Sequence, residues 1–478
     1  MADINKLMEI PWLEKAPPTE NAAVTREMAS RSGRTNLLRI RWISILLESR
    51  WPQFLVRLLT LAGFIFTIAA GLLGSRVGSH NFAIIFVWIA WWTGLKLVFI
   101  PFGGRAWCSV CPIPLPGDWL QQGGVLEKGQ RRFGLNLRWP KRLKGSWLQS
   151  GGFLLIGLFS ALTLTDARIT GWVLVGLFGL AVGLSLIFER RAFCSHICPI
   201  GGFSGMYAQT APVELRVLDK NLCATHGEKT CYQNCPWGLY PLAMRDSSAC
   251  GLCLECLRSC PKENIALNLR PFGSDLTQAG SSRRLDEAFL ALVMLGSALA
   301  FAAVFTGPWG SLKSAAYAIG SSNWMLYAMG FLSLNLALMP GLFGLAAWAG
   351  QKWAGSKDSL RTAVARQTPA LLPLGLMAWI AFTISFAFPK FSYVLAVLSD
   401  PFGWSWNLLG TANNPWSPDV SGFSPASQVA ILLIGLFWSA SVACRQAKAG
   451  AKLIVRQAIP ILAFCLIFSL AMLWLLVG

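Results

Sequence analysis

The sequence predicts an all-α polytopic membrane protein of about nine transmembrane helices, with an inserted two-cluster ferredoxin-like domain on the cytoplasmic side. Three observations support this fold class. Of the 478 residues, 54% are hydrophobic and 13% are charged, whereas soluble domains average about 25% charged residues. Long apolar runs recur along the chain, and seven of the 13 cysteines fall in one long polar segment between two of these runs.

The apolar runs are the primary signal for membrane spans. Each is long enough to cross a hydrocarbon core of about 30 Å, and each is bounded by charged or Pro/Gly-rich residues. Because they recur throughout the chain, we expect a multi-pass protein of the cell (inner) membrane. The predicted spans lie near residues 54–74, 82–102, 147–165, 169–188, 287–307, 324–349, 369–388, 426–443 and 457–477.

The basic residues predict the orientation. The net charge is +19, and 35 of the 41 Lys and Arg residues fall in the five segments that share a side with the N-terminus. Such an excess marks the cytoplasmic side, so the charge indicates membrane topology and argues against nucleic acid as a partner. The first 50 residues do not resemble a signal peptide. We therefore expect the N-terminus inside and the C-terminus outside, with Arg57 and Lys96 reaching from their spans to the interface.

An internal repeat divides the membrane part. The sequence RAWCSVCPIP begins at Arg105 and RAFCSHICPIG begins at Arg191, and each copy follows a predicted hairpin of two spans. Repeated hairpins are expected to pack around a pseudo-two-fold axis, which brings their cysteines together at the cytoplasmic face. The predicted domains are a basic N-terminal segment (1–50), the two hairpins (51–198), a ferredoxin-like domain (199–286) and a five-helix membrane domain to which the sequence assigns no role (287–478).

One cysteine run carries the strongest chemical signal. Cys250, Cys253, Cys256 and Cys260, followed by Pro261, have the C-x2-C-x2-C-x3-C-P spacing of bacterial ferredoxins. Three such thiolates bind three irons of a [4Fe–4S] cube, and the fourth ligates a neighbouring cluster. A disulfide is disfavoured in the cytoplasm, and zinc sites rarely have this spacing.

A second run precedes it and is less regular. Cys223, His226, Cys231 and Cys235 are followed by Pro236. By the exchange of fourth ligands, Cys235 should join Cys250, Cys253 and Cys256 on the first cluster, whereas Cys260 should join Cys223 and Cys231 on the second. His226 stands where the missing cysteine would be, and we expect it to complete the second cluster. The alternatives are a [3Fe–4S] cluster with a solvated His226, or a fourth ligand from water or another cysteine.

The repeated hairpins end in cysteine pairs, Cys108 with Cys111 and Cys194 with Cys198, and a proline follows each pair. Four thiols at one depth predict either a third cluster, a redox dithiol or a metal-transfer site. Cys444 and Cys465 stand alone, and the sequence predicts only apolar filling for them.

Other cofactors lack their motifs. The chain has three histidines and no C-x-x-C-H, so neither a bis-His haem nor a covalent haem is expected. It has no G-x-G-x-x-G fingerprint and no P-loop, which argues against nicotinamide chemistry and ATP hydrolysis. With no catalytic residue indicated, we expect an electron-transfer subunit of an oxidoreductase complex rather than a stand-alone enzyme.

The cysteine motifs of residues 50–272 together resemble those of the membrane polyferredoxins of the NapH, NosR and MauN type. That resemblance implies an electron conduit between the quinone pool and a respiratory redox enzyme, with other redox subunits, quinone and membrane lipid as partners. The chain departs from the pattern in the C-x2-C spacing of its first hairpin and in the missing cysteine of its second ferredoxin run. An assembly factor that uses the hairpin cysteines to reduce or transfer a metal is the alternative.

Overall fold

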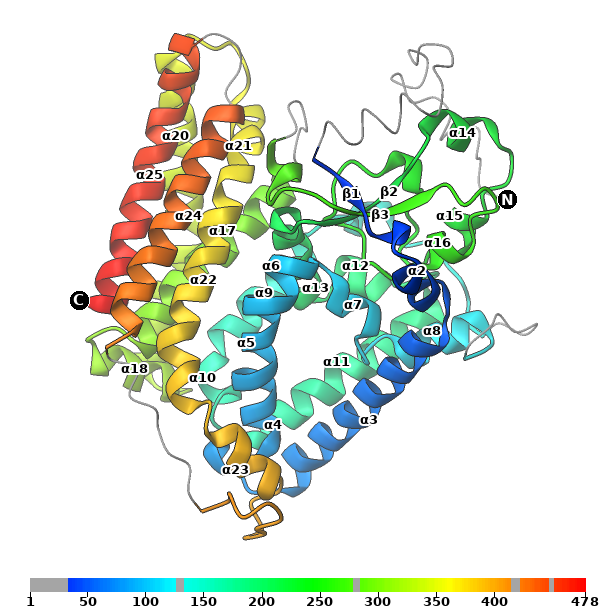
Figure 1. The fold of residues 1–478 in the computed structure, drawn as a ribbon. Coiled ribbons are helices and arrows are strands. Elements are labelled where there is room, and N and C mark those ends of the chain that lie inside the picture. Colours follow the sequence, from blue (N-terminus) through cyan, green and yellow to red (C-terminus); the bar gives the residue numbers. More distant parts are fainter. Residues whose placement is uncertain (1–32, 126–132, 278–283, 414–421, 447–450) are drawn as a thin grey trace.

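The structure is a computed structural model that describes residues 33–125, 133–277, 284–413, 422–446 and 451–478 (Figure 1). Within these ranges, eight helices are long and apolar enough to cross a membrane, so the predicted all-α polytopic class is confirmed. The predicted run 147–165 forms two shorter helices, α9 (Trp147–Leu158) and α10 (Ser160–Thr163). The eight long spans are Trp51–Leu73, Phe82–Gly103, Ala167–Ile187, Leu285–Phe305, Ser322–Trp353, Leu360–Lys390, Ser424–Gln446 and Val455–Val477.

The two hairpins pack together through small residues. Helix α3 (Trp51–Leu73) lies against α11 (Ala167–Ile187). A Cβ added to Gly71 would lie 3.2 Å from Gly171 Cα, so glycine permits this close approach of the two backbones. Both helices slant away from the rest of the molecule in Figure 1.

The second span is not a uniform α-helix. It contains two π-helical stretches, η4 (Ile85–Trp91) and η5 (Leu95–Phe99), on either side of the short α5 (Trp92–Gly94). Lys96 lies in η5 and is only 1% exposed. The expectation that Lys96 reaches the interface is therefore wrong, because rings from the C-terminal domain enclose its ammonium group.

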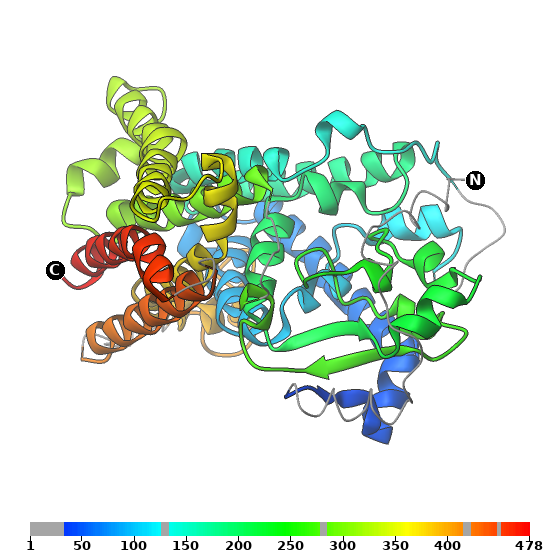
Figure 2. The ribbon, with the colours of Figure 1, turned by 90° about the horizontal axis from the view of Figure 1, so that it is seen from above.

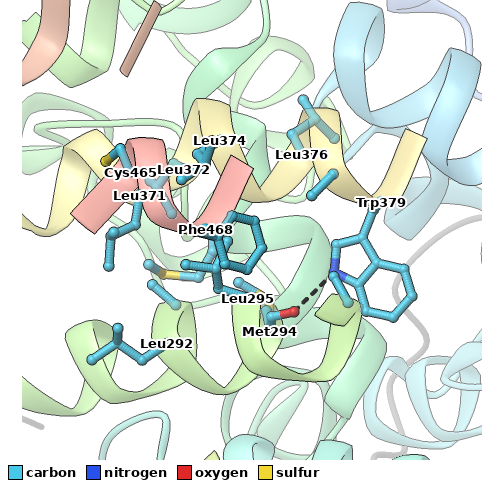
Figure 3. Packing of buried hydrophobic residues seen from close by; sticks show 14 of the residues in the cluster. Leu292, Met294, Leu295, Leu371, Leu372, Leu374, Leu376, Trp379, Cys465 and Phe468 are labelled. Carbon is cyan, nitrogen blue, oxygen red and sulfur yellow. Dashed lines mark hydrogen bonds between the residues drawn. The ribbon is translucent and has the colours of Figure 1, made fainter. Parts of the chain in front are cut away.

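The C-terminal spans form a compact bundle beside the hairpins (Figure 2). Its centre is the contact of α17 (Leu285–Phe305) with α22 (Leu371–Ala387), and α24 (Ser424–Gln446) and α25 (Ala451–Val477) pack around α22. The Trp379 indole donates a hydrogen bond of 3.1 Å to the Met294 carbonyl (Figure 3). Burying this N–H with a partner avoids the cost of an unsatisfied donor. The remaining part of the bundle consists of α18 (Gly310–Tyr317), α19 (Ser322–Ser333), η10 (Leu334–Leu338), α20 (Met339–Trp353) and α21 (Leu360–Gln367). Helix α23 (Tyr393–Ser399) instead packs against η3 (Gly78–His80) and η4 of the first hairpin.

The polar domain, which the sequence predicts over residues 199–286, contains strands of a small antiparallel sheet. Its order is β1 (Thr35–Asn36), β3 (Ile265–Leu269), β2 (Val213–Val217), with Leu215 opposite Leu267. Strand β1 comes from the predicted N-terminal segment, whose residues 1–32 lie outside the described residues. The predicted domain 199–286 begins with α13 (Pro199–Tyr207), which is buried against α9 and α17. The sheet and the ends of both hairpins lie on the same side of the molecule (Figure 1).

Candidate metal centre

The first group of thiols comprises Cys235, Cys250, Cys253 and Cys256. Cys235 caps α15 (Thr230–Asn234), and Cys256 lies in α16 (Glu255–Arg258). Burial raises the pKa of Cys253 to about 12, and repulsion from the Cys235 and Cys250 thiols adds to the effect. Burial and then the other three thiols raise the pKa of Cys256 as well. These four sulfurs are therefore close enough to interact through space.

The loop that carries this group is locally strained. Leu252 and Leu254, on either side of Cys253, have φ values of 48° and 63°. Such values are uncommon for residues other than glycine and are maintained where the surroundings require them. Among the described residues, no three His, Cys, Asp or Glu side chains are arranged to hold a single ion.

The second group comprises Cys223, Cys231 and Cys260. Burial raises the pKa of Cys231, and the neighbouring Cys223 and Cys260 thiols raise it further. The Tyr240 hydroxyl lies 3.6 Å from Cys223 Sγ and donates to the Cys223 carbonyl at 3.0 Å. Sequence reasoning missed Tyr240, since no spacing rule links a single tyrosine to a cysteine 17 positions earlier.

His226 ends the short helix α14 (Lys220–Thr225) that carries Cys223. Its Nδ1 atom is buried and has no hydrogen-bond partner in the part of the chain that the structure describes. Its carbonyl accepts a hydrogen bond of 2.8 Å from Lys229 Nζ. A ring nitrogen without a partner is available as a ligand, because neutral imidazole binds metal through its lone pair.

The third group joins the two hairpins. Cys111 caps α7 (Ala106–Val110), Cys194 lies in α12 (Ala192–His196), and Cys198 caps α13. Burial raises the pKa of Cys194, and Cys198, Cys111 and Cys108 raise it further. Burial also raises the pKa of Cys198, to about 11. The four hairpin thiols therefore lie near one another.

In three of the four Cys-Pro sequences, the cysteine sulfur accepts a hydrogen bond from a backbone amide three or four residues later. The sulfur of Cys198 accepts from the Gly201 amide at 3.3 Å, that of Cys235 from the Leu239 amide at 3.4 Å, and that of Cys260 from the Asn264 amide at 3.3 Å. Amide hydrogen bonds to sulfur stabilise the thiolate and tune the potential of an iron–sulfur centre. Each of the three groups contains one such sulfur.

Two arginines and a tryptophan lie between the hairpin group and the first ferredoxin group. The Trp237 ring lies 4.3 Å from the Arg105 guanidinium carbon and 5.5 Å from that of Arg191. It belongs to the same packed cluster as Cys111, Cys194 and Cys198. A Cβ added to Gly251 would lie 2.3 Å from Trp237 Nε1.

Arg105 and Arg191 are the first residues of the two copies of the repeat. Their equivalent positions are the signal from which sequence reasoning could have identified them as site residues. Arg191 donates to both carboxylate oxygens of Asp118 and, at 2.8 Å, to the Cys108 carbonyl. Arg105 donates to the Ser248 carbonyl at 2.8 Å. Each arginine therefore ties its hairpin to a neighbouring segment and places a positive charge among the thiols.

The donors around these thiols fit iron–sulfur clusters. Arg105 Nε and Nη2 and Trp237 Nε1 are buried and lack hydrogen-bond partners within the described ranges. A buried donor without an acceptor is costly. A cluster with four thiolate ligands is anionic and presents sulfur acceptors, so it would satisfy these donors and balance the Arg105 charge, whereas Arg191 is already paired with Asp118.

Comparison with known proteins points to the same chemistry. A 4Fe-4S binding domain family matches residues 84–136 and 170–217, and each stretch contains one hairpin cysteine pair. The methylamine utilization ferredoxin-type protein MauN of Paracoccus denitrificans is 27% identical over 164 residues, covering 30% of this chain and 52% of the relative.

Two further relatives carry the same name. MauN of Methylorubrum extorquens is 26% identical over 30% of this chain and 50% of the relative, and MauN of Methylobacillus flagellatus is 29% identical over 28% and 49%. The chain thus spans about half the length of the curated relatives it matches. No solved structure matches.

Proposed function

We propose that this chain, a membrane polyferredoxin of the MauN type, passes electrons between a quinone or an outer redox partner and the clusters of its ferredoxin-like domain. It would do so as a subunit of a respiratory complex, with the ferredoxin-like domain on the cytoplasmic side. The observation that carries the proposal is the succession of three thiol groups, from the ends of the hairpins to the far end of the polar domain.

Each group has the ligands for one cluster. Cys235, Cys250, Cys253 and Cys256 would hold the first [4Fe–4S] cluster. Cys223, Cys231 and Cys260 would hold the second, with His226 as its fourth ligand or as a [3Fe–4S] cluster, and Cys108, Cys111, Cys194 and Cys198 would hold a third at the membrane edge. A bound iron–sulfur cluster supplies reversible electron storage at a potential set by its surroundings.

The order of the groups in space supports electron transfer. Trp237 belongs to the packed cluster that includes the hairpin cysteines and lies close to Gly251 of the first ferredoxin group. Cys256 of the first group interacts with Cys231 of the second. Arg105 and Arg191 stabilise negative charge on both sides of Trp237. These proximities support electron transfer from group to group within the chain.

The rival role in metal transfer needs thiols that a recipient protein can reach. Cys194 is 8% exposed, whereas Cys108, Cys111 and Cys198 are partly exposed. Reactive thiols are partly exposed and have a lowered pKa, whereas burial raises the pKa of Cys194. This arrangement favours a permanently held cluster.

Rapid mixing of the purified chain with a quinol and with dithionite tests the proposal. We expect quinol to bleach the visible absorbance of the ferredoxin clusters in the wild type and in the control Cys465→Ser, whose thiol is buried in the C-terminal bundle. Cys108→Ser and Cys194→Ser should each abolish this bleaching, while dithionite still reduces the remaining clusters. Full quinol bleaching in either hairpin variant would contradict the proposal.

A further inference from the structure

A cavity of about 440 Å³ lies within the membrane-spanning part of the molecule. Its walls come from α3, the second span, α9, α10 and α11 of the hairpins, and from α17 and α22 of the C-terminal bundle. The lining is largely apolar and aromatic, and the volume falls within the range of small-molecule sites. The C-terminal domain, which the sequence left without a role, thus closes a cavity that the hairpins alone would leave open.

Lys96 is the single charged residue in this lining. Its Nζ atom lies 5.3 Å, 5.4 Å and 5.9 Å from the ring centroids of Trp92, Trp379 and Phe382. Within the described residues it has neither an ion pair nor a hydrogen bond. A charged side chain at this depth is costly and by default indicates a function. Its position in the π-helical η5 agrees, because π-helical turns are frequent at functional sites.

A second donor lines the same cavity. The Trp91 Nε1 atom is buried and lacks a hydrogen-bond partner among the described residues. The lining hydroxyl groups of Thr60, Thr67 and Thr170 already donate to backbone carbonyls. The cavity therefore calls for a flat apolar ligand that carries hydrogen-bond acceptors.

We propose that this cavity binds the head group of a membrane quinone, with one carbonyl oxygen accepting a hydrogen bond from Lys96 and the other lying toward Trp91. A lipid acyl chain would fill the apolar walls equally well, but it has no acceptor for either donor. The aromatic rings suit a flat quinone ring, since offset and edge-on ring contacts add to apolar burial.

The position of the cavity connects it to the proposed electron route, on which this inference rests. Cys111 and Pro112 of the first hairpin motif line it, as does Pro199 directly after Cys198. The Trp91 ring also lies 5.6 Å from the ring of Trp107, the residue before Cys108. Oxidation of a bound quinol to quinone would release two electrons and two protons. Clusters held by the hairpin and ferredoxin cysteines could each take up one electron, and the protons would pass to solvent.

Equilibrium binding of decylubiquinone to the purified, cluster-loaded full chain tests the assignment. Lys96→Met should weaken binding about twofold to tenfold, the range for loss of a single hydrogen bond. Lys352→Met, which removes an exposed charge at the end of α20, should leave binding unchanged. Decylbenzene, which has the same tail and no carbonyl, should bind wild type and Lys96→Met alike and more weakly than decylubiquinone.

A second variant keeps the test decisive if Lys96→Met fails to fold. Thr67 lines the cavity, and its hydroxyl bonds only to Gly63 of the same helix, at 2.7 Å. Thr67→Phe should therefore reduce the cavity and weaken decylubiquinone binding while Lys96 is intact. Binding as tight as in wild type in either folded variant, or decylbenzene binding as tightly as decylubiquinone, would overturn the assignment. If the wild-type chain does not bind decylubiquinone but an outer redox partner still reduces its clusters, this inference is overturned. The proposed electron route would then remain.

Discussion

The ion pair between Asp118 and Arg191 should be a principal support of the hairpin site. The Arg191 side chain is 1% exposed and that of Asp118 is 8% exposed, and Arg191 Nε lies 3.1 Å and 3.0 Å from the two carboxylate oxygens. Asp118→Ala would leave a buried guanidinium without its counter-ion. Loss of one partner of a buried pair costs about 3–5 kcal/mol of unfolding free energy.

Denaturant titration of the purified chain in detergent measures this loss. The matched control is Asp358→Ala, which removes the carboxylate from a pair with Arg366 whose side chains are 26% and 15% exposed. Because solvent screens such a pair, its loss should cost only about 0–1 kcal/mol. The Asp118→Ala variant should also lose hairpin iron, since Arg191 donates to the Cys108 carbonyl.

A double variant separates the ion pair from simple packing. Asp118→Leu with Arg191→Met replaces both charges by apolar groups, and such replacements are often neutral or stabilising. Most of the lost stability should therefore return. The reasoning is refuted if Asp118→Ala is no less stable than Asp358→Ala, or if the double variant is as unstable as the single one.

Three further predictions concern His226, the topology and pH. A neutral imidazole makes its cluster less negative, so His226→Cys should lower that cluster's reduction potential and His226→Ala should lose iron or change the EPR signal; unchanged values in both variants exclude His226 as a ligand. Reporter fusions after Gly273 and Gly478 should give opposite compartments, and one shared compartment would disprove the nine-span count. Burial alone would raise the pKa of Asp275, but hydrogen bonds and charge from Arg270 bring it below its usual value. Ionised Asp275 therefore stabilises the folded chain, fully above about pH 4, and this contribution is lost as pH falls through the folded pKa. Unfolding curves of Asp275→Asn should lack that acid-dependent part, and an acid profile identical to wild type would contradict the ion-pair account.

Local sequence patterns predicted most of the membrane part. Eight of the nine predicted runs form long apolar helices in the described residues, because a long apolar run leaves the backbone few alternatives in lipid. The run 147–165 differs because α9 ends at Leu158, and residues 159–165 form only a short second helix. Strand β1 was missed because two residues carry no periodicity, and its pairing with β3 is set by contacts far along the chain.

At the site too, local sequence features could be predicted, whereas contacts between distant segments could not. Cysteine spacing predicts which thiols belong together, since the spacing fixes how a short loop can present them. It does not predict Trp237 or Tyr240, whose positions depend on how the polar domain packs on the hairpins. Lys96 illustrates the limit most clearly. The prediction that it reaches the interface used its own span alone, whereas Trp379 and Phe382 from the C-terminal bundle decide its environment.

Iron and acid-labile sulfide per chain, measured together with EPR of the dithionite-reduced protein, test the central claim most directly. Three thiol groups that each hold a cluster predict about twelve iron atoms per chain, or about eleven if the second cluster is [3Fe–4S]. Cys108→Ser should lose about four of them together with one EPR component. A wild-type chain with about eight iron atoms, unchanged by Cys108→Ser, would contradict the account.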